Sequence, residues 1–311
     1  MRVTSTMFPD ALIGQLGLLS TRQLQLQNEA ATGLRVQNPA DDPAAMRRAL
    51  DMQAQSKLIT QYQTNITSLQ NQAAATSSVT SSLQKITDRV NEIATLTDGT
   101  KSQQDLNAYA TEVNQLIQQA AQLVNSKNAG EYLFGGTRSD VPPFVVATDS
   151  SSNVTSVTYQ GNTSVNSSEI AEGLTISAQT LGANTTGSGP TGLITDSRTG
   201  ADLFSHLISL QTHLLAGDTA SIASTDRPQL TADENNMISQ TATIAALQAR
   251  LTAASSMATG RSATLTQSIS NETNADIAQT MVQLSQTQTA YQAALQSGAK
   301  ILSLSLLDYL R

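Results

Sequence analysis

The hydrophobic residues near the N-terminus recur in alternating steps of four and three. The positions concerned are Leu12, Leu16, Leu19, Gln23, Leu26 and Ala30. This spacing places them on one face of a helix, as in the seam of a coiled coil, and the polar Gln23 interrupts the stripe once. The pattern therefore predicts a long helix with one apolar face.

Two further stretches before residue 128 carry the same periodicity. One comprises Leu58, Tyr62, Ile66, Leu69, Ala73, Val79, Leu83, Ile86, Val90 and Ile93. The other comprises Leu106, Ala110, Val113, Ile117, Ala120 and Val124. Three helices are therefore expected to occupy most of the first 128 residues.

The pattern changes character after residue 128. Glycine and proline become frequent in residues 130–143, and the following segment is rich in Val, Thr and Ser with short alternations such as "VTSVTYQGN". Such alternation is typical of short strands. We therefore predict a β-rich insertion over residues 135–195, with turns at residues 160–162 and 181–184.

Helical spacing returns at residue 201. Leu203, Leu207, Leu210 and Leu214 share one face, and Gly217 suits the end of that helix. A long helix is expected through Ile244, Leu247 and Leu251. The last stripe follows steps of four and three through Ile277, Met281, Leu284, Gln288, Tyr291, Leu295, Gly298 and Leu302.

The chain is therefore predicted to be mainly α with a small β-rich insertion. The N- and C-terminal segments are expected to pair as a long antiparallel coiled coil or helical bundle. The expected parts are terminal arms (1–42 plus 272–311), a helical rod (43–134 plus 196–271) and an outer β-rich domain (135–195). The assembly seam is predicted at Leu12, Leu16, Leu19, Leu26, Met281, Leu284, Tyr291, Leu295 and Leu302.

Composition favours an assembling protein over an enzyme with a thick core. Only 13% of the residues are charged and 39% are hydrophobic, and there is no Trp. Uncharged polar flanks can be covered by neighbouring subunits without burying unpaired ions. The net charge of −7 and the absence of basic clusters argue against nucleic-acid partners.

Targeting and redox signals are sparse. The sequence shows neither an apolar run of membrane-spanning length nor an evident cleaved signal peptide, so membrane insertion is not expected. Cysteine is absent, which excludes disulfides and thiolate metal sites.

The stretch "LRVQNPADDPAA" at residues 34–45 permits two interpretations. Its adjacent acids could belong to a catalytic pair, but no partner carboxylate or base accompanies them. Asp42 followed by Pro43 suits the start of a helix, where the carboxylate accepts from exposed amides. We favour a helix cap at Asp42 and Pro43, preceded by a turn at Asn38 and Pro39.

No other pattern indicates an active site. His206 and His213 lie two helical turns apart, about 10 Å, which is too far to chelate one ion. Nucleophile elbows, phosphate loops and zinc-protease motifs are absent from the sequence. No catalytic residue, cofactor site or metal site is therefore predicted.

Three stretches resemble the flagellin-like axial proteins of the bacterial flagellum. They are "TGLRVQNPADDPAA" at 32–45, "EYLFGGTRSDVPPF" at 131–144 followed by "VTYQGN", and the segment 274–310 beginning "NADIAQTMVQLSQ". Together these stretches bracket the chain. Within this family, Pro39 and Pro43 favour the subunits of the hook-filament junction over flagellin itself.

The resemblance implies a structural subunit that is needed for filament attachment and motility. Its implied partners are further copies of itself in a ring, hook-associated protein 1, flagellin and a cytoplasmic export chaperone. It also implies unfolded export through the flagellar type III apparatus to an extracellular location. The alternatives are a short flagellin or, in another class, a secreted adhesin or enzyme on a coiled-coil stalk.

Overall fold

The computed structural model describes the backbone of residues 7–97 and 99–309 and the side chains of residues 10–97 and 99–300. The chain forms two compact units. The terminal unit comprises Met1–Leu58 and Arg261–Arg311, and the middle unit comprises Ile59–Gly260.

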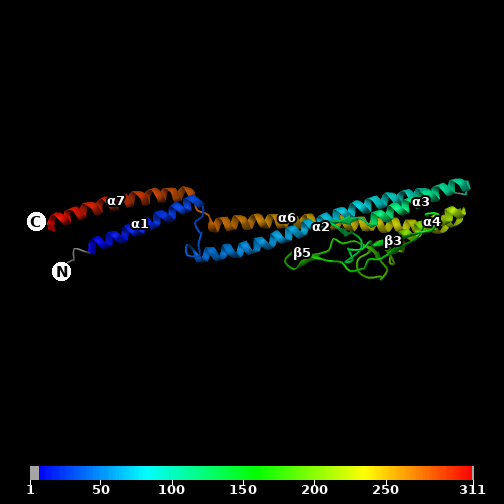
Figure 1. Cartoon of the computed structure of the whole chain (residues 1–311), viewed down its shortest axis with the longest axis horizontal. Coiled ribbons are helices and arrows are strands. Elements are labelled where there is room, and N and C mark those ends of the chain that lie inside the picture. The colour runs from blue at the N-terminus through cyan, green and yellow to red at the C-terminus, as the bar shows by residue number, and fades with distance from the viewer. Residues whose placement is uncertain (1–6, 98, 310–311) are drawn as a thin grey trace. The chain divides into compact units, whose positions relative to one another are not determined.

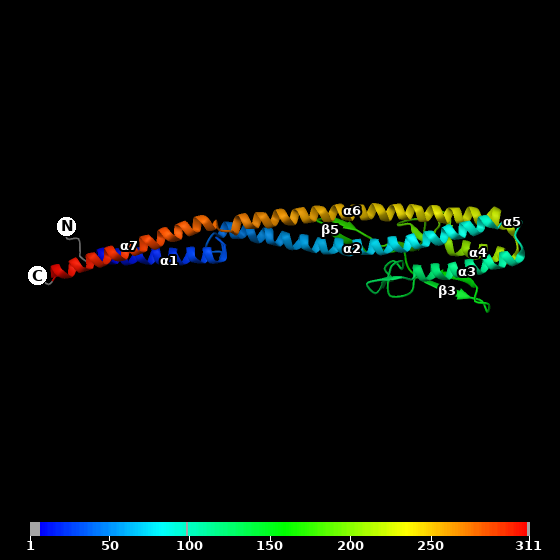
Figure 2. The same ribbon diagram turned by 90° about the horizontal axis from the view of Figure 1, so that it is seen from above.

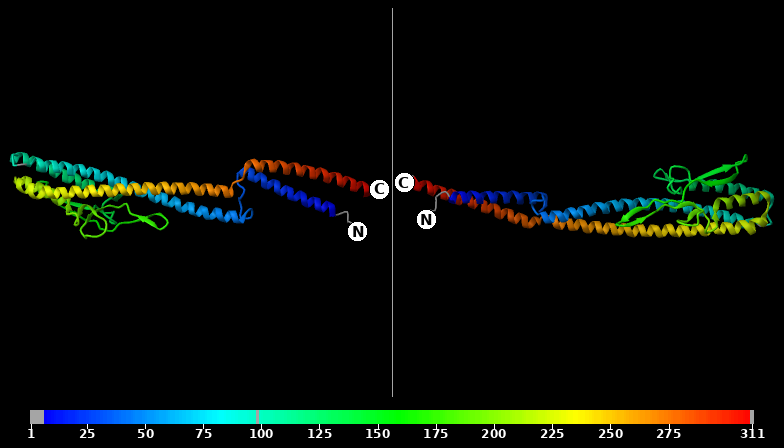
Figure 3. Two further views of the ribbon diagram at one scale, coloured as in Figure 1. Left: turned by 180° about the vertical axis from the view of Figure 1, so that it is seen from behind. Right: turned by 90° about the horizontal axis from the view of Figure 1, so that it is seen from below.

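The terminal unit is built from helices contributed by both ends of the chain. Helices α1 (Met7–Thr32) and α7 (Ile277–Tyr309) pack against each other and run in opposite directions (Figure 1; Figure 3). The unit also contains the first part of α2 (Pro43–Leu96) and the last part of α6 (Arg227–Thr273). The predicted antiparallel pairing of the two termini is confirmed.

The middle unit is a helical bundle with strands packed on it (Figure 2). Its helices are the remainder of α2 and α6, α3 (Gln103–Val124), α4 (Leu203–Ala216), the short α5 (Thr219–Ser221) and the π-helix η1 (Ile222–Asp226). Ser102 and Asp105 form a capping box that starts α3. Gly217 ends α4 in the left-handed conformation, with φ of 71°, which glycine adopts without strain.

The apolar stripes predicted from the sequence form the core of the middle unit. All six stripe positions of α3 are buried, and so are Leu203, Leu207, Leu210 and Leu214 of α4. They pack with the residues of α2 from Val79 to Ile93 and with Leu230 and Met237 of α6. A second cluster joins Ile66 and Leu69 of α2 to Ile170 and Ile176 of the strands and Leu251 of α6.

The strands form four small sheets. They are β1 (Lys127–Asn128), β2 (Glu131–Tyr132), β3 (Phe144–Thr148), β4 (Val154–Tyr159), β5 (Ser168–Ala171), β6 (Leu174–Ile176), β7 (Leu181–Asn184), β8 (Gly192–Asp196) and β9 (Ala201–Asp202). Three sheets are antiparallel pairs in chain order. The fourth has the order β7-β8-β9, with β7 and β8 parallel.

Aromatic side chains fix the strands to the helices. Phe144 contacts Tyr159 and Phe204, with ring centroids 5.1 and 5.5 Å apart. The Tyr159 hydroxyl donates to the carbonyl of Phe134 (2.9 Å). A Cβ at Gly182 would lie 2.7 Å from the Phe144 ring, so the close approach of β7 requires glycine there.

The fold class expected from the sequence is confirmed, since the chain is mainly helical, with long helices near both ends and a small β-rich region in the middle of the sequence. The turn expected at residues 181–184 is wrong, because this segment is the buried strand β7. Its glycine and asparagine suggest a turn, but they serve close packing and side-chain hydrogen bonding. The three-part division of the chain stays a prediction.

Candidate assembly interface

The two ends of the chain are joined in the terminal unit by backbone hydrogen bonds. The N–H groups of Arg35 and Val36 donate to the carbonyl of Thr273 (2.7 and 3.2 Å), and Ala275 N–H donates to the carbonyl of Gly33 (2.9 Å). These bonds surround an isolated antiparallel bridge between Leu34 and Asn274. We call this region the joint.

Side chains reinforce the joint. Arg48 donates from Nε and Nη2 to the two carboxylate oxygens of Glu272 (3.0 and 2.7 Å). Arg35 donates to the carbonyl of Glu272 (2.9 Å) and pairs with Asp42 (3.3 Å). The hydrogen bonds from Arg48 lower the pKa of Glu272 below its usual value.

Both acids of the "NPADDP" stretch accept backbone hydrogen bonds. Asp42 accepts from the N–H of Ala45 (3.0 Å), and Pro43 is the first residue of α2. Asp41 accepts from the N–H groups of Gln37 and Asn38 (3.0 and 2.8 Å). These bonds lower the pKa of each carboxyl below its usual value. The geometry gives both acids a role in the backbone turn, which also contains the exposed Pro39.

The predicted seam residues differ in their burial within the α1 and α7 pair. Leu26 is buried, and Leu12, Leu16, Leu19, Leu284 and Tyr291 are partly buried. Met281 and Leu295 remain 53% and 46% exposed. Leu302 lies outside the residues whose side chains are described. The role of all nine residues in an assembly seam stays a prediction.

The nine-residue seam leaves out two buried positions of α7, Thr280 and Gly298, although the predicted stripe contains Gly298. Thr280 is 5% exposed, and Gly298 is buried so close to Leu12 that a Cβ there would lie 2.5 Å from the leucine Cδ2. Large apolar side chains stay exposed on both helices; these are Ile13, Leu18, Leu24, Ile277, Met281, Val282 and Leu295. An apolar surface of this kind marks an interaction face.

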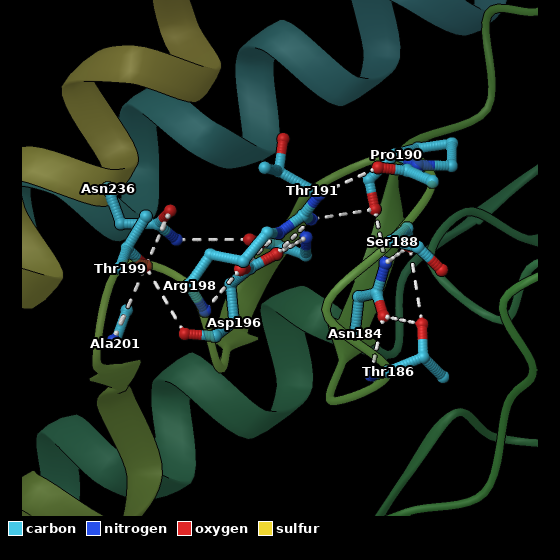
Figure 4. Close-up of polar contacts among 12 residues, drawn as sticks. Asn184, Thr186, Ser188, Pro190, Thr191, Asp196, Arg198, Thr199, Ala201 and Asn236 are labelled. Carbon is cyan, nitrogen blue, oxygen red and sulfur yellow. Dashed lines mark hydrogen bonds and ion pairs between the residues drawn. The ribbon is translucent and has the colours of Figure 1, made fainter.

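The middle unit contains a polar network around the ion pair of the buried Asp196 and the exposed Arg198 (Figure 4). Arg198 donates from Nε and Nη2 to the two oxygens of Asp196 (2.9 and 2.6 Å) and from Nη1 to the carbonyl of Gly189. Asn184 donates to the carbonyls of Ser188 and Pro190. The hydrogen bonds from Arg198 lower the pKa of Asp196 to about 2. This network fixes the loop between β7 and β8.

Both histidines pair with buried carboxylates. Nδ1 of His206 lies 2.8 Å from Oδ2 of Asp233, and Nδ1 of His213 lies 2.7 Å from Oδ2 of Asp226. The two acids lie on α6 and η1, so the pairs connect α4 to these elements. The sequence did not reveal these partners, because they are 27 and 13 residues away.

A hollow of about 440 Å³ in the middle unit has Asp202 as the one acid among its lining residues. Asp202 accepts there from the hydroxyls of Thr195 and Ser205. Within the described residues, no group of three or more His, Cys, Asp or Glu could hold a metal ion. The described helices also include none long and apolar enough to cross a membrane.

Comparison with known proteins first gives the class of protein. Residues 18–139 match the model of the bacterial flagellin N-terminal helical region, which is less than half of the chain. The chain is thus similar over this N-terminal part to the flagellin-like helical proteins, in agreement with the paired terminal helices.

The particular protein that this chain resembles is flagellar hook-associated protein 3. This chain is 29% identical over 155 residues to flagellar hook-associated protein 3 of Salmonella typhimurium. The match covers 48% of this chain and 47% of the relative. The same protein of Escherichia coli K12 is 31% identical over 121 residues, covering 37% of each. The matches thus span half or less of the length of these relatives.

A solved structure shares the fold. The protein of Vibrio parahaemolyticus, assigned as a flagellar hook-associated protein, aligns with a TM-score of 0.63 at 17% identity. The alignment covers 75% of this chain and 100% of that one. The resemblance inferred from the sequence motifs is confirmed.

Proposed function

We propose that this chain is a structural subunit of the bacterial flagellum that joins the hook to the filament. The carrying observation is its similarity to two curated relatives that are both flagellar hook-associated protein 3. The paired terminal helices support the proposal, because they leave several large apolar side chains exposed. Neighbouring subunits would cover these side chains.

The proposed partners are further copies of the chain in a ring, hook-associated protein 1 on the hook side and flagellin on the filament side. A cytoplasmic chaperone would hold the exposed terminal segment before export. The proposed location is extracellular, on the flagellum. A structural role without catalysis fits the hydrogen-bonded carboxylates described above.

Deletion of the gene tests the proposal. A junction subunit should leave intact hooks without filaments in electron micrographs, with flagellin shed into the medium and motility lost. The wild-type gene should restore both properties. Normal filaments on the deletion strain would contradict the proposal.

A short flagellin is the second candidate, because the matching family model is that of the flagellin N-terminal region. The two candidates differ in self-assembly. Purified flagellin should polymerise alone into long filaments, whereas a junction subunit should not. A deletion strain that lacks filaments without shedding flagellin would also favour the second candidate.

A further inference from the structure

A polar hollow lies where α1, the loop of residues 33–42 and the start of α7 meet in the terminal unit. It consists of two adjoining parts of about 340 Å³ each. Gln25, Glu29, Arg35 and Asp41 line both parts. We call this feature the arm hollow.

Glu29 is buried in the arm hollow without a cationic partner. Its residue is 8% exposed, and its side chain accepts one hydrogen bond, from Nε2 of Gln25 (3.0 Å). Among the described residues, no Lys, Arg or His nitrogen lies within ion-pair distance of it. A buried carboxylate is costly unless a cation or several donors satisfy it.

Thr280 is a second buried polar group that faces the hollow. It is 5% exposed and lines the first part of the hollow, and its hydroxyl has no hydrogen-bond partner among the described residues. By contrast, the hydroxyls of Thr273 and Thr287 donate to the carbonyls four residues before them (2.8 and 2.7 Å). Thr280 therefore keeps an unused donor and acceptor.

The charges that line the hollow favour a cation. Three acids, Glu29, Asp41 and Asp276, face two bases, Arg22 and Arg35. Arg35 is already paired with Asp42, which lies outside the lining. The acids therefore exceed the available bases, and a further positive group would be attracted.

We propose that a basic side chain of a second copy of this chain occupies the arm hollow in the assembled flagellum. Glu29 accepts its hydrogen bonds and the Thr280 hydroxyl is a second contact. This inference rests on the proposed function. Exposed apolar residues border the site, as Leu24 lines it at 59% exposure and Val282, at 57%, precedes the lining residue Gln283. Buried polar contacts beside apolar ones are usual at subunit interfaces.

The terminal unit itself offers the required cation. Arg47, Lys57 and Arg261 are exposed and have no ion pair among the described residues, whereas Arg48 is paired with Glu272. A hollow on one copy and a cation elsewhere on the next form a heterologous contact, which repeats around a closed ring. The proposal is therefore compatible with a ring of identical subunits.

Photo-cross-linking tests which molecule occupies the hollow. A photoreactive phenylalanine analogue replaces Gln279, an exposed lining residue, in the full chain expressed in the deletion strain. We expect an adduct of twice the 32.7 kDa chain mass. Its partner peptide should carry Arg47, Lys57 or Arg261. Adducts with other proteins only, or with none, would overturn the proposal.

Charge removal tests the role of Glu29. Glu29→Gln should lower the yield of the adduct about tenfold, because a charge-assisted hydrogen bond is lost. Asp51→Asn removes an exposed carboxylate of the same unit and should leave the yield unchanged. Thr280→Val should lower the yield, and Thr280→Ser should restore it.

Substitutions of the exposed basic residues test the proposal even if Glu29→Gln impairs folding. Gln replaces Arg47, Lys57 or Arg261 in turn, and one of these exposed substitutions should reproduce the loss of the adduct. An unchanged yield in all three would overturn the proposal. The proposed function would survive that result if the wild-type gene restored filaments to the deletion strain, so the two failures are distinguishable.

Discussion

Arg48 and Glu272 form a two-point ion pair, with N–O distances of 3.0 and 2.7 Å, between residues 224 positions apart. The pair lies beside the backbone bonds of the joint. Arg48→Met should loosen these bonds, because the carboxylate loses both donors. We expect amide exchange at Arg35, Val36 and Ala275 to become about two- to fivefold faster.

Hydrogen-exchange mass spectrometry of the monomer measures this effect. The matched control is Arg47→Met, which removes the neighbouring exposed guanidinium that has no ion pair among the described residues. Equal exchange in both variants would show that the ion pair does not hold the joint.

The buried face of α4 predicts a large loss of stability on truncation. Leu207 is fully buried, so Leu207→Ala should reduce the free energy of unfolding by about 2–5 kcal/mol through lost burial and the resulting cavity. Leu215→Ala, on the same helix at 46% exposure, should change it by less than about 0.5 kcal/mol. Urea unfolding followed by circular dichroism compares the two, and similar losses would contradict the described core.

The pair of His206 and Asp233 predicts a pH dependence. Burial opposes the charge on His206, but its hydrogen bond to Asp233 and the nearby acids outweigh this and raise its pKa above 6.5. Because the pKa of His206 is higher in the folded than in the unfolded state, the protonated imidazole stabilises the fold. This contribution is complete below pH 6.5 and is lost as the pH rises through the folded-state pKa. Wild-type stability should therefore fall as the pH rises above 6.5.

His206→Ala tests this contribution. It should cost about 2–3 kcal/mol at pH 6, because Asp233 keeps a buried oxygen without its partner. The decline in stability above pH 6.5 should also become shallower. An unchanged slope in urea unfolding across this range would exclude His206 as its source.

The lowered pKa of Asp196 predicts a loss of stability in acid. Hydrogen bonds from Arg198 lower its pKa from 3.8 to about 2, so its stabilising contribution is present above pH 3.8 and is lost as the pH falls toward 2. Asp196→Asn should be less stable at neutral pH and should lack this part of the acid transition. Unfolding midpoints at a series of pH values measure the loss of stability in wild type and variant, with Asp51→Asn as the exposed control.

A charge at Leu295 should affect assembly but not folding. It is 46% exposed in the pair of α1 and α7, so Leu295→Glu should leave the subunit folded, whereas a charge in an assembled seam should abolish filament attachment. Leu215→Glu charges an equally exposed leucine of the middle unit. Electron microscopy of complemented deletion strains gives the result, and normal filaments with Leu295→Glu would remove this residue from the seam.

Sequence periodicity predicted the core best where the stripes are apolar. Every position of the apolar stripe predicted for α3 is buried, because the stripe lies on one face of that helix. The face of α7 was harder to determine, since its buried positions include Thr280 and Gly298, which carry no hydrophobic signal. Met281 and Leu295 fit the steps of four and three, yet they remain about half exposed in the arm pair.

Pairings between distant residues could not be predicted from local patterns. The two histidines were recognised as one face of a helix, but their partners Asp226 and Asp233 are positioned by the packing of α4 against η1 and α6. Likewise, Asn184 and Gly182 look like turn residues. Both residues lie in strand β7. The absence of a side chain at Gly182 lets the Phe144 ring pack against the strand, and the Asn184 side chain donates a hydrogen bond to the carbonyl of Pro190 in the following loop.

The bridge between Leu34 and Asn274 joins residues 240 positions apart in the sequence and closes the loop between them. The entropy lost in closing a loop grows with its length, and contacts between distant residues slow folding. Once the middle unit has folded, it spans most of this loop, and fewer flexible residues remain to be ordered. The terminal helices should therefore pair last during refolding, so the order of folding follows from the position of one backbone bridge.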